Sequence, residues 1–178
     1  MIVYHGSNHC FKKLKIGKSL VERRSTLENE GIGIYFSTDR TVAESYGKYV
    51  YEIELENIQD FRKRSECKKY LNEICAFVLY KTKVNIKKYI YFDATVSDMK
   101  AGGLSIAEIG KELQLQCDSR NEFYTELSET KRQKIFQCLK TYAKNHLTAY
   151  MFQYHIKNIG VIKDLACVKS FDILSQLK

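Results

Sequence analysis

Residues 33–46 read Gly33-Ile34-Tyr35-Phe36-Ser37-Thr38-Asp39-Arg40-Thr41-Val42-Ala43-Glu44-Ser45-Tyr46. The opening apolar run predicts a strand over residues 31–36, in which glycines permit close approach of another backbone. Asp39 is a suitable N-cap for a short helix over residues 40–46, which Gly47 can terminate. The segment thus places two tyrosines, Tyr35 and Tyr46, on a strand and on the helix that follows it.

A second informative segment, Val3-Tyr4-His5-Gly6-Ser7, lies thirty residues upstream and ends a predicted strand over residues 2–4. A histidine at a strand end can hydrogen-bond a ribose hydroxyl, and the glycine after it lets a planar amide reach main-chain N–H and C=O groups. Two tyrosine rings can sandwich a cationic ring, each contributing roughly 0.5–2 kcal/mol. Together these groups suit nicotinamide riboside better than a neutral metabolite.

The two segments resemble the ADP-ribosyltransferase superfamily, in particular the diphtheria-toxin and poly(ADP-ribose) polymerase branch with its His-Tyr-Glu signature. The resemblance covers residues 1–57 and, more loosely, 148–165. It implies an α+β fold, an ADP-ribosyltransferase-like split β-sandwich, and NAD as ADP-ribose donor. The implied cofactor-binding residues are His5, Gly6, Ser7, Tyr35, Ala43 and Tyr46, of which His5 and Tyr35 also belong to the catalytic set.

The third catalytic position departs from the family pattern. In the late segment 152–163, Gln153 falls where the family has glutamate, so we expect Gln153 to align the ribose without supplying a full charge. Ala43 replaces a serine that commonly contacts the nicotinamide amide, and the loss of one neutral hydrogen bond weakens binding by about 0.5–1.5 kcal/mol. Other acids, at 52, 54, 56, 122, 126 and 129, are interpreted as solvent-facing.

The composition is that of one globular domain: 178 residues, 44% hydrophobic and 28% charged. No window approaches the ~18–20 apolar residues of a membrane span, and the chain enters a strand-like segment at once. We therefore expect no membrane contact and a cytoplasmic protein, acting in its own cell or in a target cell. Six cysteines without a Cys-x-x-Cys pair indicate free thiols and no metal.

Periodicity predicts a single domain over residues 1–178, with core strands in about 1–57 and 148–178 and a mainly helical insert over about 60–147. The connection over 8–30 is expected to be irregular or partly helical. Further strands are predicted at 49–55, 91–93, 150–156 and 161–162, and helices at 66–80, at 105–113 and from Ser128 through Tyr142.

Three functions remain open at this point. The first is a mono-ADP-ribosyltransferase that acts on a protein or nucleic-acid acceptor, in a toxin-like role if the acceptor belongs to a target cell. The second is a catalytically weak or inactive module that binds NAD or ADP-ribose and acts through a partner, for which the insert offers a surface. The third is a nucleic-acid-directed protein, suggested by the net charge of +8. A solvated, lysine-rich surface also accounts for that charge.

Overall fold

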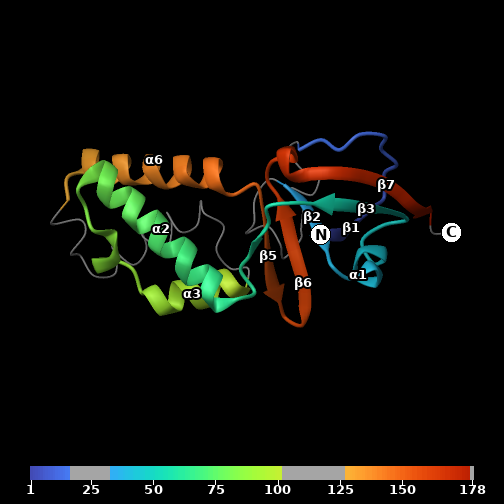
Figure 1. The fold of residues 1–178 in the computed structure, drawn as a ribbon, viewed down its shortest axis with the longest axis horizontal. Coiled ribbons are helices and arrows are strands. Elements are labelled where there is room, and N and C mark those ends of the chain that lie inside the picture. Colours follow the sequence, from blue (N-terminus) through green and yellow to red (C-terminus); the bar gives the residue numbers. More distant parts are fainter. Residues whose placement is uncertain (17–32, 102–126, 177–178) are drawn as a thin grey trace.

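The computed structural model describes residues 1–16, 33–101 and 127–176. These residues form an α+β structure in which a seven-stranded sheet stands beside a group of helices (Figure 1). The sheet order is β4-β5-β6-β2-β1-β3-β7. The strands are β1 (Ile2–Ser7), β2 (Ile34–Ser37), β3 (Tyr49–Leu55), β4 (Gln59–Asp60), β5 (Ala149–Tyr154), β6 (Lys157–Ile162) and β7 (Val168–Gln176).

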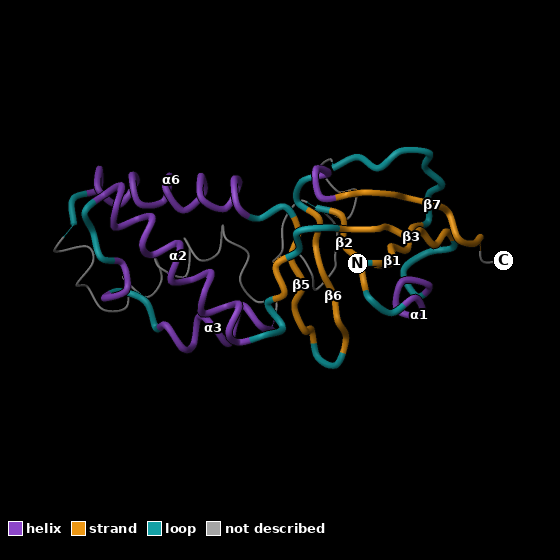
Figure 2. Tube along the Cα trace, in the orientation of Figure 1, coloured by secondary structure: helices purple, strands orange, loops and turns teal. Residues whose placement is uncertain are grey.

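The sheet is mixed and strongly twisted. Only the short β4 pairs in parallel, with β5, and the other neighbours are antiparallel. In Figure 2, β5 and β6 run across the direction of β3 and β7, and the change of direction falls around β2 and β1. The α+β class is confirmed. The finer expectation of a split β-sandwich stays a prediction, since hydrogen bonding joins all seven strands into one sheet.

The helices of the insert lie together beyond the β5 edge (Figure 1). They are α2 (Arg64–Thr82), α3 (Phe92–Ala101) and α6 (Glu129–His146), and a 3₁₀ turn at Ile86–Lys88 lies between α2 and α3. Apolar residues recur every three or four positions in α2, so Leu71, Ile74 and Val78 share one fully buried stripe. A hydrophobic cluster joins these helices to Tyr150, Phe152, Ile159 and Val161 on β5 and β6.

A second hydrophobic cluster fills the opposite face of the sheet. It includes Val3, Phe36, Ile53, Met151 and Ile162, all nearly inaccessible to solvent. Alternation along each strand explains the division, since successive side chains point to opposite faces. On β6, Ile159 and Val161 join the helical cluster, whereas Ile162 joins the second one.

Several predicted elements are confirmed, including the strand at 49–55, the helices within 66–80 and from Ser128, and the short helix capped by Asp39. That helix, α1, spans Arg40–Glu44. The strand predicted at 91–93 is wrong, because α3 begins at Phe92. The helix predicted at 105–113 lies outside the described residues. None of the described helices combines the length and apolarity needed to cross a membrane.

Candidate functional site

The His5 side chain connects β1 to β2 at the point where their backbone pairing stops. Within the described strands, β1 and β2 share one paired position, Tyr4 with Ser37, whereas β1 and β3 pair over six. One residue further along β1, the Nδ1 atom of His5 lies 2.6 Å from the carbonyl oxygen of Tyr35. The imidazole therefore links β1 to the backbone of β2 at this point.

This hydrogen bond determines the tautomer of His5. A carbonyl oxygen can only accept, so Nδ1 must carry the hydrogen, and in the neutral ring the lone pair lies on Nε2. Burial lowers the pKa of His5, and the bond to the Tyr35 carbonyl opposes this only in part. At neutral pH, His5 is thus an uncharged imidazole that donates from Nδ1 and accepts at Nε2. An acceptor of this kind can bind a hydroxyl group.

Aromatic rings pack beside the imidazole. Phe11, Tyr51 and Phe171 stack nearly parallel, with ring centroids 4.2 Å apart for Phe11 and Tyr51 and 5.1 Å apart for Tyr51 and Phe171. The centroids of Phe11 and Tyr51 lie 5.9 and 6.2 Å from that of His5. The Tyr51 hydroxyl accepts from the Phe11 N–H at 2.9 Å and donates to the His9 carbonyl at 3.1 Å. It thereby holds the segment after β1 against the sheet.

Sequence reasoning missed Tyr51 as a neighbour of the site. Its signal was available, because Tyr51 lies on a strand of clear two-residue alternation and faces His5 directly across β1 and β3. The missing information was which strand pairs with β1. Ser7, in contrast, was predicted and lies at the end of β1, where its hydroxyl accepts from the His9 N–H at 3.1 Å.

Gly6 lies against α1. A Cβ atom at this position would overlap the backbone carbonyl of Ala43 and would lie 3.2 Å from the Cβ of Tyr46. The structure therefore brings together three of the predicted residues: Gly6, Ala43 and Tyr46. The same close packing requires glycine at position 6 whether or not a ligand binds there.

The position of α1 is set by hydrogen bonds at its first turn. Asp39 accepts from the backbone and side chain of Thr41 at 2.8 and 2.7 Å, and these bonds lower the pKa of its carboxyl group. The Ser37 hydroxyl accepts from the Asp39 N–H and donates to the Asn158 carbonyl, both at 3.0 Å. The end of β2, the cap of α1 and the start of β6 are thus held in one network.

The two tyrosines of the predicted clamp lie in different environments. Tyr46 follows α1 and keeps 52% of its surface exposed. Tyr35 is half-buried and packs at the margin of the helical cluster, to which Val42 of α1 also belongs. Both tyrosines therefore lie on the same face of the sheet, the one on which α1 packs against Gly6. A planar ligand held between them would lie over this face. The side chain of His5, which alternates with Gly6, instead packs beside Phe11 and Tyr51 on the face of the second hydrophobic cluster.

Gln153 is not brought to this site. It is exposed near the end of β5, where it faces Asn158 across the β5–β6 hairpin. Because β6 lies between β5 and β2, two strand spacings, about 10 Å, separate Gln153 from β2. The strand adjacent to β2 begins with Lys157 and the half-buried Asn158. Asn158 is the polar residue of this hairpin closest to β2, and sequence reasoning did not single it out.

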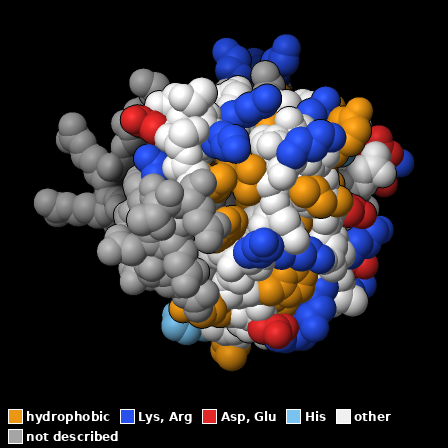
Figure 3. All heavy atoms as spheres, turned by 90° about the vertical axis from the view of Figure 1, so that its left-hand side faces the viewer, with side chains coloured by type: hydrophobic (Ala, Val, Ile, Leu, Met, Phe, Trp, Pro, Cys, Tyr) orange, Lys and Arg blue, Asp and Glu red, His pale blue; other side chains and the backbone are white. Residues whose placement is uncertain are grey.

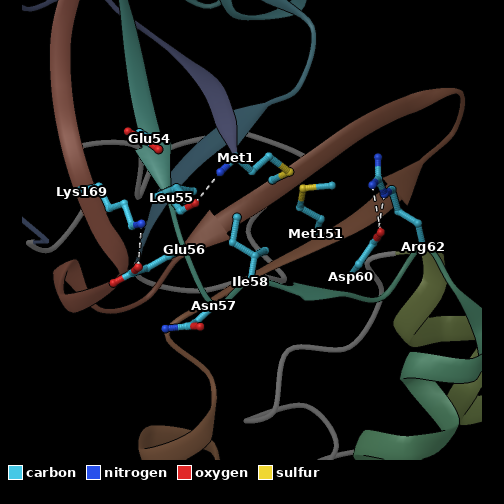
Figure 4. A pocket seen from close by; sticks show the side chains of 10 residues that line it. All are labelled: Met1, Glu54, Leu55, Glu56, Asn57, Ile58, Asp60, Arg62, Met151 and Lys169. Atoms are coloured by element: carbon cyan, nitrogen blue, oxygen red, sulfur yellow. Dashed lines mark hydrogen bonds and ion pairs between the residues drawn. The ribbon is translucent and has the colours of Figure 1, made fainter.

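A groove of about 350 Å³ lies elsewhere, lined by ten residues (Figure 4): Met1, Glu54, Leu55, Glu56, Asn57, Ile58, Asp60, Arg62, Met151 and Lys169. No residue of the predicted site lines it. Several of its charged groups have partners: Arg62 Nε lies 2.7 Å from Asp60, Lys169 Nζ lies 3.1 Å from Glu56, and the Met1 ammonium donates to the Leu55 carbonyl at 2.6 Å.

Among the described residues, no cluster of His, Cys, Asp and Glu side chains could hold a metal ion. The described cysteines, at 10, 67, 75, 138 and 167, are free thiols, as expected from the sequence. Burial raises the pKa of Cys67 and of Cys75 to about 11 each, so these two thiols stay protonated at neutral pH and are poor nucleophiles.

Comparison with known proteins gives no family for this chain. No family model matches the sequence, and the search of curated proteins found no match. A crystal structure of an anti-CRISPR protein is similar at 10% sequence identity, covering 98% of this chain and 95% of that chain, with a TM-score of 0.44. At that identity and score, the similarity supports no conclusion about fold family or activity.

Proposed function

We propose that this protein is an NAD-dependent mono-ADP-ribosyltransferase, which cleaves the nicotinamide–ribose bond and transfers ADP-ribose to a protein or nucleic-acid acceptor in a cytosol. The observation that carries the proposal is the state of His5. Its bond to the Tyr35 carbonyl and its burial make it a neutral imidazole whose Nε2 can accept, directly before the glycine that the resemblance assigns to nicotinamide. The two tyrosines lie on the other face of the sheet, so NAD would have to pass the end of β1 to contact them and His5 together.

Each residue has a distinct part in holding NAD. Nε2 of His5 accepts from a hydroxyl of the nicotinamide ribose, and main-chain groups at Gly6 bind the carboxamide. Tyr46, which is exposed, closes over the cationic ring from the side of α1, while Tyr35 supports the opposite face. Ala43 presents no hydroxyl to the amide, so the carboxamide depends on the main chain.

The reaction breaks one bond and forms one. The electron pair of the C–N bond leaves with nicotinamide, which departs as a neutral molecule, and C1 of the ribose becomes an oxocarbenium ion. An acceptor hydroxyl or amine adds to C1, and its proton passes to water. No carboxylate has been assigned to the developing charge, so we expect slow, single transfers rather than chain growth.

The third position has two candidates, Gln153 and Asn158, which face each other across the hairpin. The resemblance favours Gln153, whereas Asn158 lies one strand closer to β2. Gln153→Ala and Asn158→Ala should therefore be compared for the rate of nicotinamide release. Gln137→Ala serves as a control, because Gln137 is an exposed glutamine on α6.

The direct test is to incubate the protein with NAD carrying a label on its adenylate part, together with cell lysate, and to follow both released nicotinamide and labelled macromolecules. Digestion with protease or nuclease then identifies the class of acceptor. The proposal is supported if the unchanged protein labels a macromolecule and the Tyr46→Ala variant does not. The enzymatic function is rejected if a folded protein supplied with intact NAD gives no nicotinamide release and no labelling.

The alternative is a binding module that holds NAD or ADP-ribose without turnover. The absence of an assigned carboxylate near His5 favours it, since binding needs only the hydrogen bonds and the aromatic faces. Calorimetry distinguishes the two functions: saturable binding of NAD without nicotinamide release, lost in Tyr46→Ala, indicates the module.

A further inference from the structure

The positive charge of the protein is concentrated in the helical part. Residues 60–147 contain seventeen Lys and Arg against eleven Asp and Glu, whereas the rest of the chain contains twelve against ten. Most of the net charge of +8 therefore belongs to the insert. The proposed NAD site lies outside it, on β1, β2 and α1, so the charge of the insert has no part in the roles assigned above.

Lysines gather where α2 ends, at the end of the helices furthest from the sheet (Figure 1). We define the distal surface by the exposed residues of this region: Leu79, Tyr80, Lys81, Lys83, Lys87 and Lys88. Figure 3 views the molecule from this end and shows Lys and Arg side chains interleaved with hydrophobic ones on the part that is not grey.

Tyr80 is the centre of the distal surface. It keeps 69% of its surface exposed, and its neighbour Leu79 keeps 43%. The Nζ atoms of Lys81 and Lys83 lie 5.2 and 5.5 Å from the centroid of the Tyr80 ring. Lys83 reaches the ring because it takes the left-handed conformation, with φ of 61°, at the end of α2. Glycine is the usual residue there, so a lysine in its place carries a conformational cost.

These lysines have no ion-pair partner among the described residues. In the ranges that the structure describes, no carboxylate forms an ion pair with Lys81, Lys83, Lys87 or Lys88, although Arg64 and Lys68, at the other end of α2, pair with Asp93. An exposed aromatic ring flanked by two ammonium groups can make two kinds of contact with a nucleic acid: the ring can stack on a base, and the cations can bind the phosphates on either side.

We infer that the distal surface binds single-stranded nucleic acid, with Tyr80 stacking on a base and Lys81 and Lys83 contacting the adjacent phosphates. An acidic protein would match the charge but would not need a freely exposed ring between two cations. Duplex nucleic acid keeps its bases stacked internally, so it would use the lysines alone. This inference is independent of the NAD site, and either can fail while the other holds.

The test uses the full chain and fluorescently labelled single-stranded RNA and DNA of mixed sequence, with binding followed by anisotropy over a range of salt concentrations. Tyr80→Ala should weaken binding about tenfold, the effect of losing one stacked base. Because Tyr80 is exposed, this variant should fold normally. Binding of NAD should be unchanged in Tyr80→Ala, whereas Tyr46→Ala should show the reverse pattern.

A matched pair of double variants separates a site from general charge attraction. Lys81→Gln with Lys83→Gln removes two charges from the distal surface, and Lys12→Gln with Lys13→Gln removes two exposed charges from the connection after β1. The first should lower the slope of log K against log salt by about 1.4, because each phosphate contact on a single strand contributes about 0.7. The second should leave the slope nearly unchanged.

Three outcomes overturn the inference. The first is the absence of binding at low salt. The second is equal weakening by the two double variants, which indicates attraction by net charge alone. The third is binding that does not depend on base stacking. This would be shown by Tyr80→Ala binding as tightly as the unchanged protein, or by duplex nucleic acid and an acidic polypeptide such as polyglutamate binding as tightly as the single strand.

Discussion

Replacement of His5 by alanine tests the centre of the proposed site. His5→Ala removes a donor to the Tyr35 carbonyl and the acceptor that we assign to the ribose hydroxyl. The two losses are measured separately, since the first acts on folding and the second on ligand binding. His9→Ala is the matched control, because His9 is an exposed histidine four residues further along the chain.

The magnitudes follow from the hydrogen bonds. Loss of one hydrogen bond costs about 0.5–1.5 kcal/mol, and for a chain of this size each kcal/mol lowers the melting temperature by about 2–4 °C. Loss of about 1 kcal/mol therefore lowers it by about 2–4 °C. Loss of the neutral bond to NAD, about 0.5–1.5 kcal/mol, weakens binding roughly two- to twelvefold. Differential scanning fluorimetry and calorimetry with NAD measure the two effects.

The same residue makes the stability depend on pH. Burial lowers the pKa of His5 below its ordinary value of about 6.5, so the folded protein binds this proton more weakly than the unfolded chain does. The contribution of His5 is complete above about pH 6.5 and declines as the pH falls from there towards the folded pKa. His5→Ala should remove this part of the pH dependence, and NAD binding should weaken over the same acidic range.

The reasoning is refuted if folded His5→Ala binds NAD as tightly as the unchanged protein. It is also refuted if His9→Ala has the larger effect, or if acidification strengthens NAD binding.

Three further substitutions test the surroundings of the site. Gly6→Ala should destabilise the protein by about 1–3 kcal/mol and displace α1, because the new Cβ overlaps the Ala43 carbonyl; chemical denaturation measures the loss, and a change within 0.5 kcal/mol contradicts the contact. Tyr51→Phe keeps the ring stack but loses two hydrogen bonds to the connection after β1, so urea unfolding should show a loss of about 1–3 kcal/mol, and unchanged stability would argue against them. Leu71→Ala leaves a cavity in the fully buried stripe of α2 and should lower the free energy of unfolding by about 2–5 kcal/mol. The NAD affinity of the folded variant, measured by calorimetry below its melting temperature, should stay unchanged.

Local sequence signals predicted most of the individual elements. The two-residue alternation of β3, the three- and four-residue spacing in α2, and the capping side chains Asp39 and Ser128 all correspond to the elements observed. Phe92 shows the limit of such signals: aromatic residues favour strands, but here the chain folds into α3 against α2. Packing between elements outweighed the local preference.

The order of the strands depended on pairings that no local pattern encodes. The turn between β5 and β6 holds His155 at a φ of 52°, without the glycine or asparagine that marks most tight hairpins. The sequence therefore predicted a strand through Ile156, and the start of the strand beside β2 was not recognised. The assignment of Gln153 to the third position rested on the family resemblance alone, and Asn158 was not considered.

The sequence by itself was enough to propose which residues carry the chemistry, because an imidazole, a glycine and two tyrosines at these spacings resemble a known set. Only the tertiary structure decided how His5 is held. The Tyr35 carbonyl that fixes its tautomer lies thirty residues away in the chain, and the rings of Tyr51 and Phe11 come from two other segments. Protonation and tautomer depend on burial and on hydrogen-bond partners, and both arise only when distant segments pack together.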